Sequence, residues 1–326
     1  MNHELVAEYL ANTKSPVQLV KHFDEVIENH KLVPLAAQEK HDGVYCLAVV
    51  IDGVVKLYGR TGLKLYWEAD AVLSERYDPM DGGANPDPHL KDGVFIGEFC
   101  NAHYTLEQLS GYLNPNRKKE WEDTDRDQLL SQSDIYMHDY LTFDELLGGH
   151  SERPYIERHK LLAKRLFQAG RSSWLIPYQL VYNEQAAHEF ADRLINQGKE
   201  GAVLKRLDCD WVAGHKGFRA TKLVRGVSLD LRCVGVLFGK GKRAGQIAAL
   251  EFEYKGNKFK ADLGKGWTDE RRAALTNDYE SGDLFGNSYP VGKIWELKAL
   301  DISSTGKALR LPKVVRVRWD KDEPDA

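Results

Sequence analysis

Hydrophobic and polar residues alternate along this chain with two different periods. Between residues 44 and 60, β-rich apolar runs flank Asp52-Gly53, a pair that suits the tight turn of a β-hairpin. Residues 157–169 and 184–197 instead place apolar side chains at the spacing of an amphipathic helix. Strands and helices follow one another without a strict β-α-β rhythm. The pattern therefore predicts an α+β domain with antiparallel sheets.

Polar residues that can cap a first turn mark further helix starts. Ser15-Pro16 precedes an apolar pattern that runs to His30, which predicts a capped helix. Thr105 and Thr142 each open a sequence typical of a capping box. Strands are predicted at Val94–Phe99, Ile135–Leu141 and Gly201–Leu207, and a loop is predicted at residues 78–93, which are rich in Gly, Pro and Asp.

The pattern changes after about residue 227, where short strands become more frequent. Strands with one helix in about 100 residues outline an OB-fold, a small Greek-key barrel that commonly binds nucleic acid. We therefore expect two domains, residues 1–227 and residues 228–326. In the second, the strands are predicted at residues 228–238, 246–254, 257–263, 291–299 and 314–319, and the helix at Thr268–Leu275.

Composition is that of an ordinary globular protein, with 326 residues, 42% of them hydrophobic and 29% charged. No apolar run has the length of a membrane span, and the N-terminus lacks the pattern of a signal peptide. The four cysteines lie far apart and form no C-x-x-C motif, which argues against a zinc knuckle or a disulfide framework. We expect reduced thiols, a cytoplasmic location and no membrane partner.

The net charge of −4 does not by itself indicate a nucleic-acid-binding protein, but its distribution is uneven. Residues 205–243 contain ten Lys and Arg against three Asp, and residues 306–321 contain six against one. Acidic residues concentrate elsewhere, as in residues 120–125. An acidic protein of this kind can carry a basic face.

The stretch from Gln38 to Gly43 holds the residue with the clearest chemical potential. An apolar run leads into it and a β-rich run leads out, so Lys40 is expected near the end of a strand at a pocket wall. A lysine held there can act as a nucleophile, because partial burial and nearby cations favour loss of its proton. The pattern K-x-D-G has only four positions, so its meaning depends on partners elsewhere in the chain.

Further motifs supply those partners, and the chain resembles an ATP-dependent DNA ligase of the compact kind encoded by bacteriophages. In that superfamily of covalent nucleotidyltransferases, six motifs in fixed order line one pocket, and candidates for all six occur here. The stretches that carry the resemblance are Lys40-His41-Asp42-Gly43, Gly59-Arg60-Thr61-Gly62, Phe95-Ile96-Gly97-Glu98, Tyr136-Met137-His138-Asp139-Tyr140 with Pro154-Tyr155-Ile156-Glu157-Arg158, Glu200-Gly201-Ala202-Val203-Leu204-Lys205, Thr221-Lys222-Leu223-Val224-Arg225, and Arg310-Leu311-Pro312 with Arg316-Val317-Arg318-Trp319-Asp320-Lys321.

The resemblance implies an antiparallel-sheet nucleotidyltransferase domain, similar to the ATP-grasp fold, followed by an OB-fold β-barrel. It implies that Lys40 attacks the α-phosphorus of ATP, that the AMP moves to the 5′-phosphate of a nick, and that the 3′-hydroxyl then displaces AMP. Each step is an in-line displacement at phosphorus, so positioning and charge neutralisation dominate. The cofactors implied are ATP and Mg²⁺, with Mn²⁺ as a substitute.

The resemblance also assigns roles to individual residues. Lys205 and Lys222 are expected to neutralise the α-phosphate, and Glu98 and Glu200 to bind metal. Arg318 and Lys321, in the mobile OB-domain, are expected to approach the pyrophosphate of ATP. The full set expected to bind nucleotide is Gln38, Glu39, Lys40, Arg60, Glu98, His138, Glu200, Lys205 and Lys222.

The partner implied is nicked double-stranded DNA, encircled by a monomer that acts in DNA replication, repair and recombination. Guanidinium groups suit bidentate contact with phosphate, which favours Arg60 as a contact to the 5′-phosphate of the nick. The residues expected to bind DNA are Arg60, Arg225, Lys240, Lys242 and Arg243.

Three positions depart from the pattern of the family. Tyr45 stands five residues after the lysine, where many ligases have an arginine. His138 aligns with the aromatic residue that stacks on adenine, and Ala220 with the first of two lysines in the basic strand.

Other functions remain open from the residues alone. An RNA ligase or an mRNA-capping guanylyltransferase shares the lysine motif, and a protein that binds nucleic acid without catalysis could keep the fold. The R-x-D-K ending and the OB-like C-terminus favour a DNA ligase over an RNA ligase, and labelling with ATP or GTP separates the guanylyltransferase.

Overall fold

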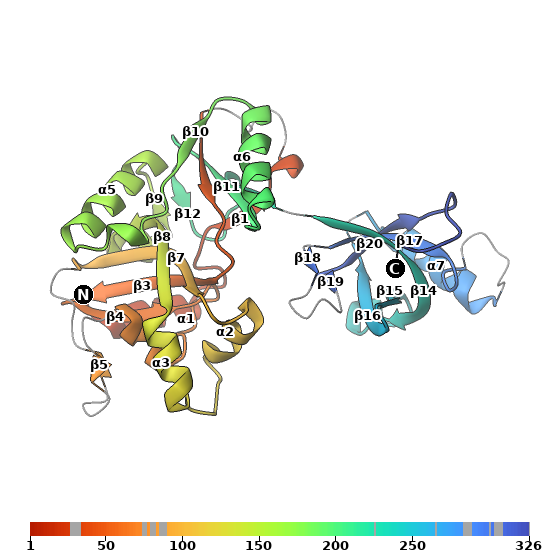
Figure 1. The fold of residues 1–326 in the computed structure, drawn as a ribbon, viewed down its shortest axis with the longest axis horizontal. Helices are drawn as coiled ribbons and strands as arrows, with labels where there is room; N and C mark the ends of the chain where they lie inside the picture. The colour runs from red at the N-terminus through yellow and green to blue at the C-terminus, as the bar shows by residue number, and fades with distance from the viewer. Residues whose placement is uncertain are drawn as a thin grey trace. The chain divides into compact units, whose positions relative to one another are not determined.

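Two compact units, Met1–Val224 and Arg225–Ala326, make up the computed structural model of the chain (Figure 1). The domain functions that the sequence predicts for residues 1–227 and 228–326 stay predictions. In the part of the chain that the structure describes, no helix is both long and apolar enough to cross a membrane. The described residues are 1–26, 34–73, 77–78, 83–84, 90–224, 226–264, 266–282, 289–299, 301–302 and 309–325.

The first unit contains two main β-sheets. One has the strand order β1-β13-β11-β2-β10 and the other the order β4-β3-β7-β8. The strands of the first are β1 (Leu19–His22), β2 (Leu35–Glu39), β10 (Gln179–Val181), β11 (Gly201–Arg206) and β13 (Lys216–Val224). Those of the second are β3 (Val44–Ile51), β4 (Val54–Tyr58), β7 (Gly93–Asn101) and β8 (Ser133–Leu141). Short pairs are formed by β5 (Tyr77–Asp78) with β6 (Gly83–Ala84) and by β9 (His150–Ser151) with β12 (Trp211–Val212).

The β4-β3-β7-β8 sheet is buried on both faces because its side chains alternate between two cores. Cys46, Ala48 and Val50 pack in the core that also holds residues of α2, α3 and α5, whereas Leu47 and Val49 pack with α1 and α4. The helices concerned are α1 (His3–Asn12), α2 (Leu106–Tyr112), α3 (Asp123–Ser131), α4 (Phe143–Leu147) and α5 (Tyr155–Gln168), with 3₁₀ turns at η3 (Trp67–Leu73) and η4 (Ser172–Trp174).

The β1-β13-β11-β2-β10 sheet is covered on one face by a single helix. Ala187, Ala191 and Leu194 of α6 (Glu184–Asn196) pack on apolar side chains of β2, β11 and β13. The other face of these three strands is therefore free to carry polar side chains, which positions the site described below.

The second unit is a closed barrel of five strands in the order β14-β15-β16-β20-β17. This arrangement confirms the predicted OB-like barrel. Its elements are β14 (Val227–Phe238), η5 (Gly241–Arg243), β15 (Ile247–Tyr254), β16 (Asn257–Leu263), α7 (Asp269–Glu280), β17 (Ile294–Ala299) and β20 (Lys313–Val317), beside a small pair of β18 (Asp301–Ile302) and β19 (Leu309–Arg310).

Most of the predicted local structure is present. The hairpin around Asp52-Gly53 forms, with positive φ at both residues as a primed turn requires. Thr105 and Thr142 both complete capping boxes. The expected loop over residues 78–93 contains part of the β5–β6 pair and the start of β7, and most of its remaining residues lie outside the described part.

One prediction about the first unit is wrong. Residues 15–26 form no α-helix; β1 and the 3₁₀ turn η1 (Phe23–Glu25) occupy this region, and residues 27–33 lie outside the described part. Strand pairing with β13 overrides the capping signal at Ser15, as tertiary contacts often override local preference. This pairing is parallel, whereas the other strand pairs of the two main sheets are antiparallel, so the predicted α+β class with antiparallel sheets is confirmed.

Candidate active site

Three neighbouring strands place the predicted nucleotide-binding side chains on one face of their sheet. Gln38 on β2 lies opposite Val203 on β11, which lies opposite Lys222 on β13. Lys205 is two residues after Val203 and therefore shares its face, because side chains along a strand alternate between faces with period two. Gln38, Lys205 and Lys222, which are far apart in the sequence, thus line one surface, opposite the face covered by α6.

Lys40 follows directly after β2 and is held by two contacts. Its backbone N–H donates to the carbonyl oxygen of Gly201 at 2.9 Å. Its Nζ donates to Oε2 of Glu200 at 2.8 Å, and both side chains are largely buried, with 20% and 14% of their surface exposed. The lysine is therefore held in a fixed position just after the end of a strand, as the sequence predicted.

Two glycines of the motifs are required by close packing. A Cβ on Gly43 would lie 2.6 Å from Sγ of Cys100 and 2.7 Å from the carbonyl oxygen of Phe99 on β7. Gly201 has φ +138°, and a Cβ there would lie 2.2 Å from the carbonyl oxygen of Leu223. A Cβ at Gly43 would push the chain before β3 away from β7, and one at Gly201 would push the start of β11 away from β13.

Glu98 on β7 belongs to the same electrostatic cluster. Burial raises the pKa of its carboxyl to about 8, the positive charges of Lys40 and Arg60 act against that rise, and the negative charge of Glu200 adds to it. A divalent cation bound at this position would relieve the repulsion that Glu98 experiences from the Glu200 carboxylate. The donor set of Glu98 and Glu200 therefore fits the hard metal ion predicted from the sequence.

His138 and Lys205 form the next contact of the site. Nζ of Lys205 lies 2.8 Å from Nδ1 of His138, and it also donates to the His138 carbonyl oxygen at 3.3 Å. Burial and the charge of Lys205 lower the pKa of His138 well below its usual value, and burial lowers the pKa of Lys205 to about 8. His138 is therefore neutral at pH 7, and its Nδ1 accepts the hydrogen bond from the ammonium group.

Tyr155, on α5, joins three of the predicted residues and was missed as a site residue by the sequence prediction. Its hydroxyl donates to Oε1 of Gln38 at 2.9 Å and lies 3.1 Å from the carbonyl oxygen of His138, while its ring centroid lies 4.6 Å from Nζ of Lys205. Gln38 is only 1% exposed, and its Nε2 donates to the carbonyl oxygen of Ile176 at 2.9 Å. Its amide is thus already fixed in orientation.

A buried ion pair joins α5, the helix that carries Tyr155, to β8. Asp139, next to His138 on β8, accepts two hydrogen bonds from the guanidinium of Arg158, at 2.9 and 3.1 Å. Burial acts to raise the pKa of Asp139, but the charges of Arg158 and Lys205 hold it below its usual value. Both residues stand in the quoted motifs, so their presence was visible in the sequence, but their pairing was not.

Several predicted residues lie apart from the Lys40 cluster. Glu39 points to the other face of β2, where its carboxylate lies 3.1 Å from Nζ of Lys199. Arg60 is exposed, although its charge acts on Glu98. Tyr45 lies directly opposite Glu98 in the β3–β7 ladder, and its ring centroid is 6.5 Å from that of His138.

The second unit holds the remaining predicted cations. Arg318 and Lys321 both pair with Asp230 of β14, and the Lys321 contact is 2.8 Å long. Hydrogen bonds to Asp320, together with the charge of Asp230, raise the pKa of Arg318, and hydrogen bonds to Asp230 and Asp325 raise that of Lys321. Lys240, Lys242 and Arg243 lie at η5, where the guanidinium of Arg243 lies 3.0 Å from Oδ1 of Asp269. Arg225 lies outside the described residues.

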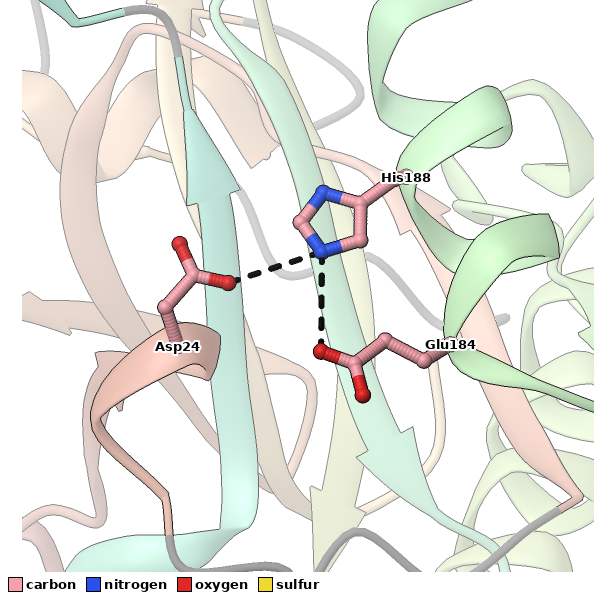
Figure 2. Close-up of side chains that lie close together, drawn as sticks. All are labelled: Asp24, Glu184 and His188. Carbon is pink, nitrogen blue, oxygen red and sulfur yellow. Dashed lines mark ion pairs between the residues drawn. The ribbon is translucent and has the colours of Figure 1, made fainter.

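A separate cluster of possible metal ligands joins η1 to α6. Nε2 of His188 lies 3.5 Å from Oδ1 of Asp24 and 3.8 Å from Oε1 of Glu184, as Figure 2 shows. One ligand atom from each residue lies within 4.8 Å of the others. All three side chains are substantially exposed, so ion pairing alone accounts for the cluster.

Comparisons with known proteins match both units. A family described as "ATP dependent DNA ligase domain" matches residues 16–223, and a family described as "DNA ligase OB-like domain" matches residues 238–318. A DNA ligase of Methanopyrus kandleri is 31% identical over 193 residues, which cover 54% of this chain and 34% of that protein. The chain spans between 34% and 39% of the length of such curated relatives.

Solved structures share the fold. One titled "Pmar-Lig_Pre." has a TM-score of 0.70 at 18% identity, covering 94% of this chain and 68% of that one. Another, from a study titled "DNA binding with a minimal scaffold: Structure-function analysis of Lig E DNA ligases", has a TM-score of 0.66 at 16% identity, covering 93% of this chain and 98% of that one. At these identities the likeness concerns the fold alone.

Proposed function

We propose that this chain, which belongs to the ATP-dependent DNA ligase family, seals nicks in duplex DNA through a covalent lysine-AMP intermediate. The observation that carries the proposal is that Lys40 pairs with Glu200 next to strands on which Lys205 and Lys222 share one face. One carboxylate and three cations gathered from distant motifs suit a site for phosphoryl chemistry.

In the first step, Nζ of Lys40 forms a bond to the α-phosphorus of ATP, and the bond to pyrophosphate breaks. Lys40 must first release its proton and leave its ion pair with Glu200. Burial and the charge of Lys40 lower the pKa of Lys222. Positive charges therefore lie close together here, and an anionic phosphate would reduce their repulsion. When bound, Mg²⁺ or Mn²⁺ would be held by Glu98 and Glu200 and would polarise the phosphate.

In the second and third steps, the AMP group passes to the 5′-phosphate of the nick, and the 3′-hydroxyl then forms the phosphodiester bond as AMP leaves. In the second step an oxygen of the 5′-phosphate attacks the phosphorus of AMP and the bond to Nζ of Lys40 breaks, whereas in the third step the 3′-hydroxyl attacks the phosphorus of the 5′-phosphate. Both displacements develop negative charge on phosphate oxygens, which the cations of the site can neutralise. Lys205 is already oriented by His138 and Tyr155, so little reorganisation is needed to present its charge.

The base-binding wall is proposed to consist of Gln38 and His138, held by Tyr155. Since Oε1 and Nε2 of Gln38 each have a protein partner, only the remaining N–H and lone pair can contact the adenine edge. His138 offers an imidazole ring where relatives have a larger aromatic, and its neutral state suits stacking on a base.

The proposed DNA contacts are Arg60 in the first unit and Lys240, Lys242 and Arg243 in the second. All four side chains are exposed or partly exposed and can reach phosphate oxygens. We further propose a monomer in the cytoplasm, and the expectation of a bacteriophage source stays a prediction. Binding to nicked DNA should weaken steeply with salt, because phosphate contacts release counterions.

A two-stage labelling experiment tests the proposal. The protein is first incubated with Mg²⁺ and with ATP that carries a label at the α-phosphate. A duplex is then added in which the nicked strand is either DNA or RNA. The label should join the protein and then leave it when the DNA nick is present. A covalent adduct formed only with GTP would support a guanylyltransferase, and release only on the RNA nick would support an RNA ligase.

A further inference from the structure

A pocket in the second unit has no role assigned by the family pattern, although Arg316, Val317 and Trp319 of its lining stand in the last motif. It has a volume of about 460 Å³ and lies between α7 and the ends of β17 and β20. This volume is in the range that holds a small organic ligand. The pocket is lined by side chains of one unit only, so it exists independently of the Lys40 site.

The wall formed by α7 has opposite charges at its two ends. Arg271, Ala274, Leu275 and Asp278 follow the spacing i, i+3, i+4, i+7, which places them on one helix face. At a rise of 1.5 Å per residue, the Cα atoms of Arg271 and Asp278 are about 10 Å apart along the axis. A ligand along this wall would meet a cation, then an apolar surface, and then a carboxylate.

The facing wall is aromatic. Trp295 is 4% exposed and Trp319 is 63% exposed, and the ring centroids of Trp267 and Trp295 lie 6.0 Å apart. The indole N–H groups of Trp267 and Trp295 donate to the carbonyl oxygens of Val314 and Pro290, at 3.1 and 3.0 Å. Their donors are thus used inside the protein, which leaves ring surface as their contribution to the pocket.

Further cations surround the pocket. The guanidinium of Arg271 lies 4.7 Å from the ring centroid of Trp267, and Nζ of Lys293 lies 4.7 Å from that of Trp319. Arg316 also lines the pocket, where Glu296 balances its charge at 2.8 Å. Aromatic rings with cations beside them are the surfaces on which proteins bind single-stranded nucleic acid, because every base has a π-face and every nucleotide a phosphate.

We propose that this pocket binds one unpaired nucleotide of a DNA strand. The base stacks on the exposed face of Trp319, its exocyclic amino group donates to Asp278, and its phosphate pairs with Arg271. The distance between Arg271 and Asp278 suits the length of a nucleotide, and their charges suit its two ends. The inference rests on the proposed function only in taking DNA as the partner.

A strand fits better than a free nucleotide because cationic and aromatic groups continue outside the pocket. Trp319 is largely exposed and has Lys293 beside it, so neighbouring phosphates of a strand would also find a positive charge. Asp278 accepts hydrogen bonds and cannot donate them when ionised, so adenine and cytosine, which carry amino groups, should bind better than thymine.

The test measures binding of fluorescein-labelled (dC)₂₀ and (dT)₂₀ by the full-length chain, by anisotropy and without ATP. Arg271→Ala and Trp319→Ala should each weaken (dC)₂₀ binding at least about fivefold, since one stacking contact contributes that much. Lys258→Ala, which removes an exposed cation of β16 outside the pocket, is the matched control and should change binding less than about twofold. Asp278→Ala should remove the preference for (dC)₂₀ over (dT)₂₀.

Three outcomes would overturn the proposal. Pocket variants could bind within twofold of the parent chain, or the Lys258 control could lose as much affinity as they do. Alternatively, free AMP could displace the oligonucleotide as effectively as unlabelled (dC)₂₀, which would make the pocket a nucleotide site. Arg271→Ala keeps the test valid if Trp319→Ala does not fold. Failure of the proposed ligase activity is seen separately, as absence of the AMP adduct, because strand binding requires no ATP.

Discussion

Nζ of Lys40 donates a hydrogen bond to Oε2 of Glu200 at 2.8 Å, although 160 residues separate the two in the sequence. The proposed nucleophile is thus paired with a proposed metal ligand. A divalent cation bound to Glu200 would compete with Lys40 for the same carboxylate. Metal binding and release of the lysine for attack are therefore expected to be coupled.

Replacement of Glu200 tests this coupling. Glu200→Gln keeps an oxygen that can accept from Lys40 but removes the charge that attracts a metal. AMP-adduct formation should fall by roughly tenfold or more, since a bound metal supplies several kcal/mol of charge stabilisation. The rate should be measured over a range of Mg²⁺ concentrations, with Glu189→Gln on the exposed face of α6 as control. An unchanged Mg²⁺ dependence would remove Glu200 from the metal site.

Tyr155→Phe removes one hydroxyl and keeps the ring beside Lys205. Gln38 and the His138 carbonyl lose their donor, so the KM for ATP should rise by about two- to tenfold, the range of one hydrogen bond, while kcat changes less. Tyr182→Phe, at a tyrosine that is 63% exposed, is the matched control. A fall in kcat at constant KM would contradict a positioning role for Tyr155.

Glu98→Gln should stabilise the protein at alkaline pH. The folded-state pKa of Glu98 is raised from 4.5 to about 8, so the folded state holds a proton that the unfolded state releases in this range. Stability from this group is present below pH 4.5 and is lost as pH rises towards about 8. The melting temperature of Glu98→Gln relative to the parent should therefore increase from pH 6 to pH 9. Glu253→Gln, on the exposed side of β15, should show no such trend; an equal trend in both would contradict the assignment.

Asp139→Ala should destabilise the first unit strongly. It leaves the guanidinium of Arg158, which is 2% exposed, without its counter-charge, and breaking such a buried pair costs about 3–5 kcal/mol. The exposed pair of Lys119 and Glu122 is the control, since Lys119→Ala should cost less than about 1 kcal/mol. Thermal unfolding followed by circular dichroism measures both. Equal effects would mean that the Asp139–Arg158 pair does not anchor α5.

Local structure was predicted best where the sequence pattern was compatible with only one type of element. The Asp52-Gly53 hairpin, both capping boxes and the barrel strands are present, because turn chemistry, caps and strand periodicity act within a few residues. The helix expected after Ser15 is wrong because β1 gains its hydrogen bonds from β13, some 200 residues away. No pattern near Ser15 carries that information.

The candidate site shows the same division. Motif residues such as Lys40, Glu98 and Glu200 were visible in the sequence because their types and order are chemically constrained. The role of Tyr155 was not visible, since it depends on α5 placing a hydroxyl against Gln38. Glu39 is in the set predicted to bind nucleotide, but strand alternation turns its side chain to the face opposite that of Gln38.

The central claim is that Lys40 carries AMP, and one measurement tests it directly. The parent chain and Lys40→Ala are incubated with α-labelled ATP and Mg²⁺, and the adduct is located by mass spectrometry of proteolytic fragments. Lys199→Ala, at an exposed lysine that pairs with Glu39, serves as control. The account predicts an AMP group on Lys40 in the parent and control chains and no adduct in Lys40→Ala. An adduct of normal yield in Lys40→Ala, or on another residue of the parent chain, would contradict it.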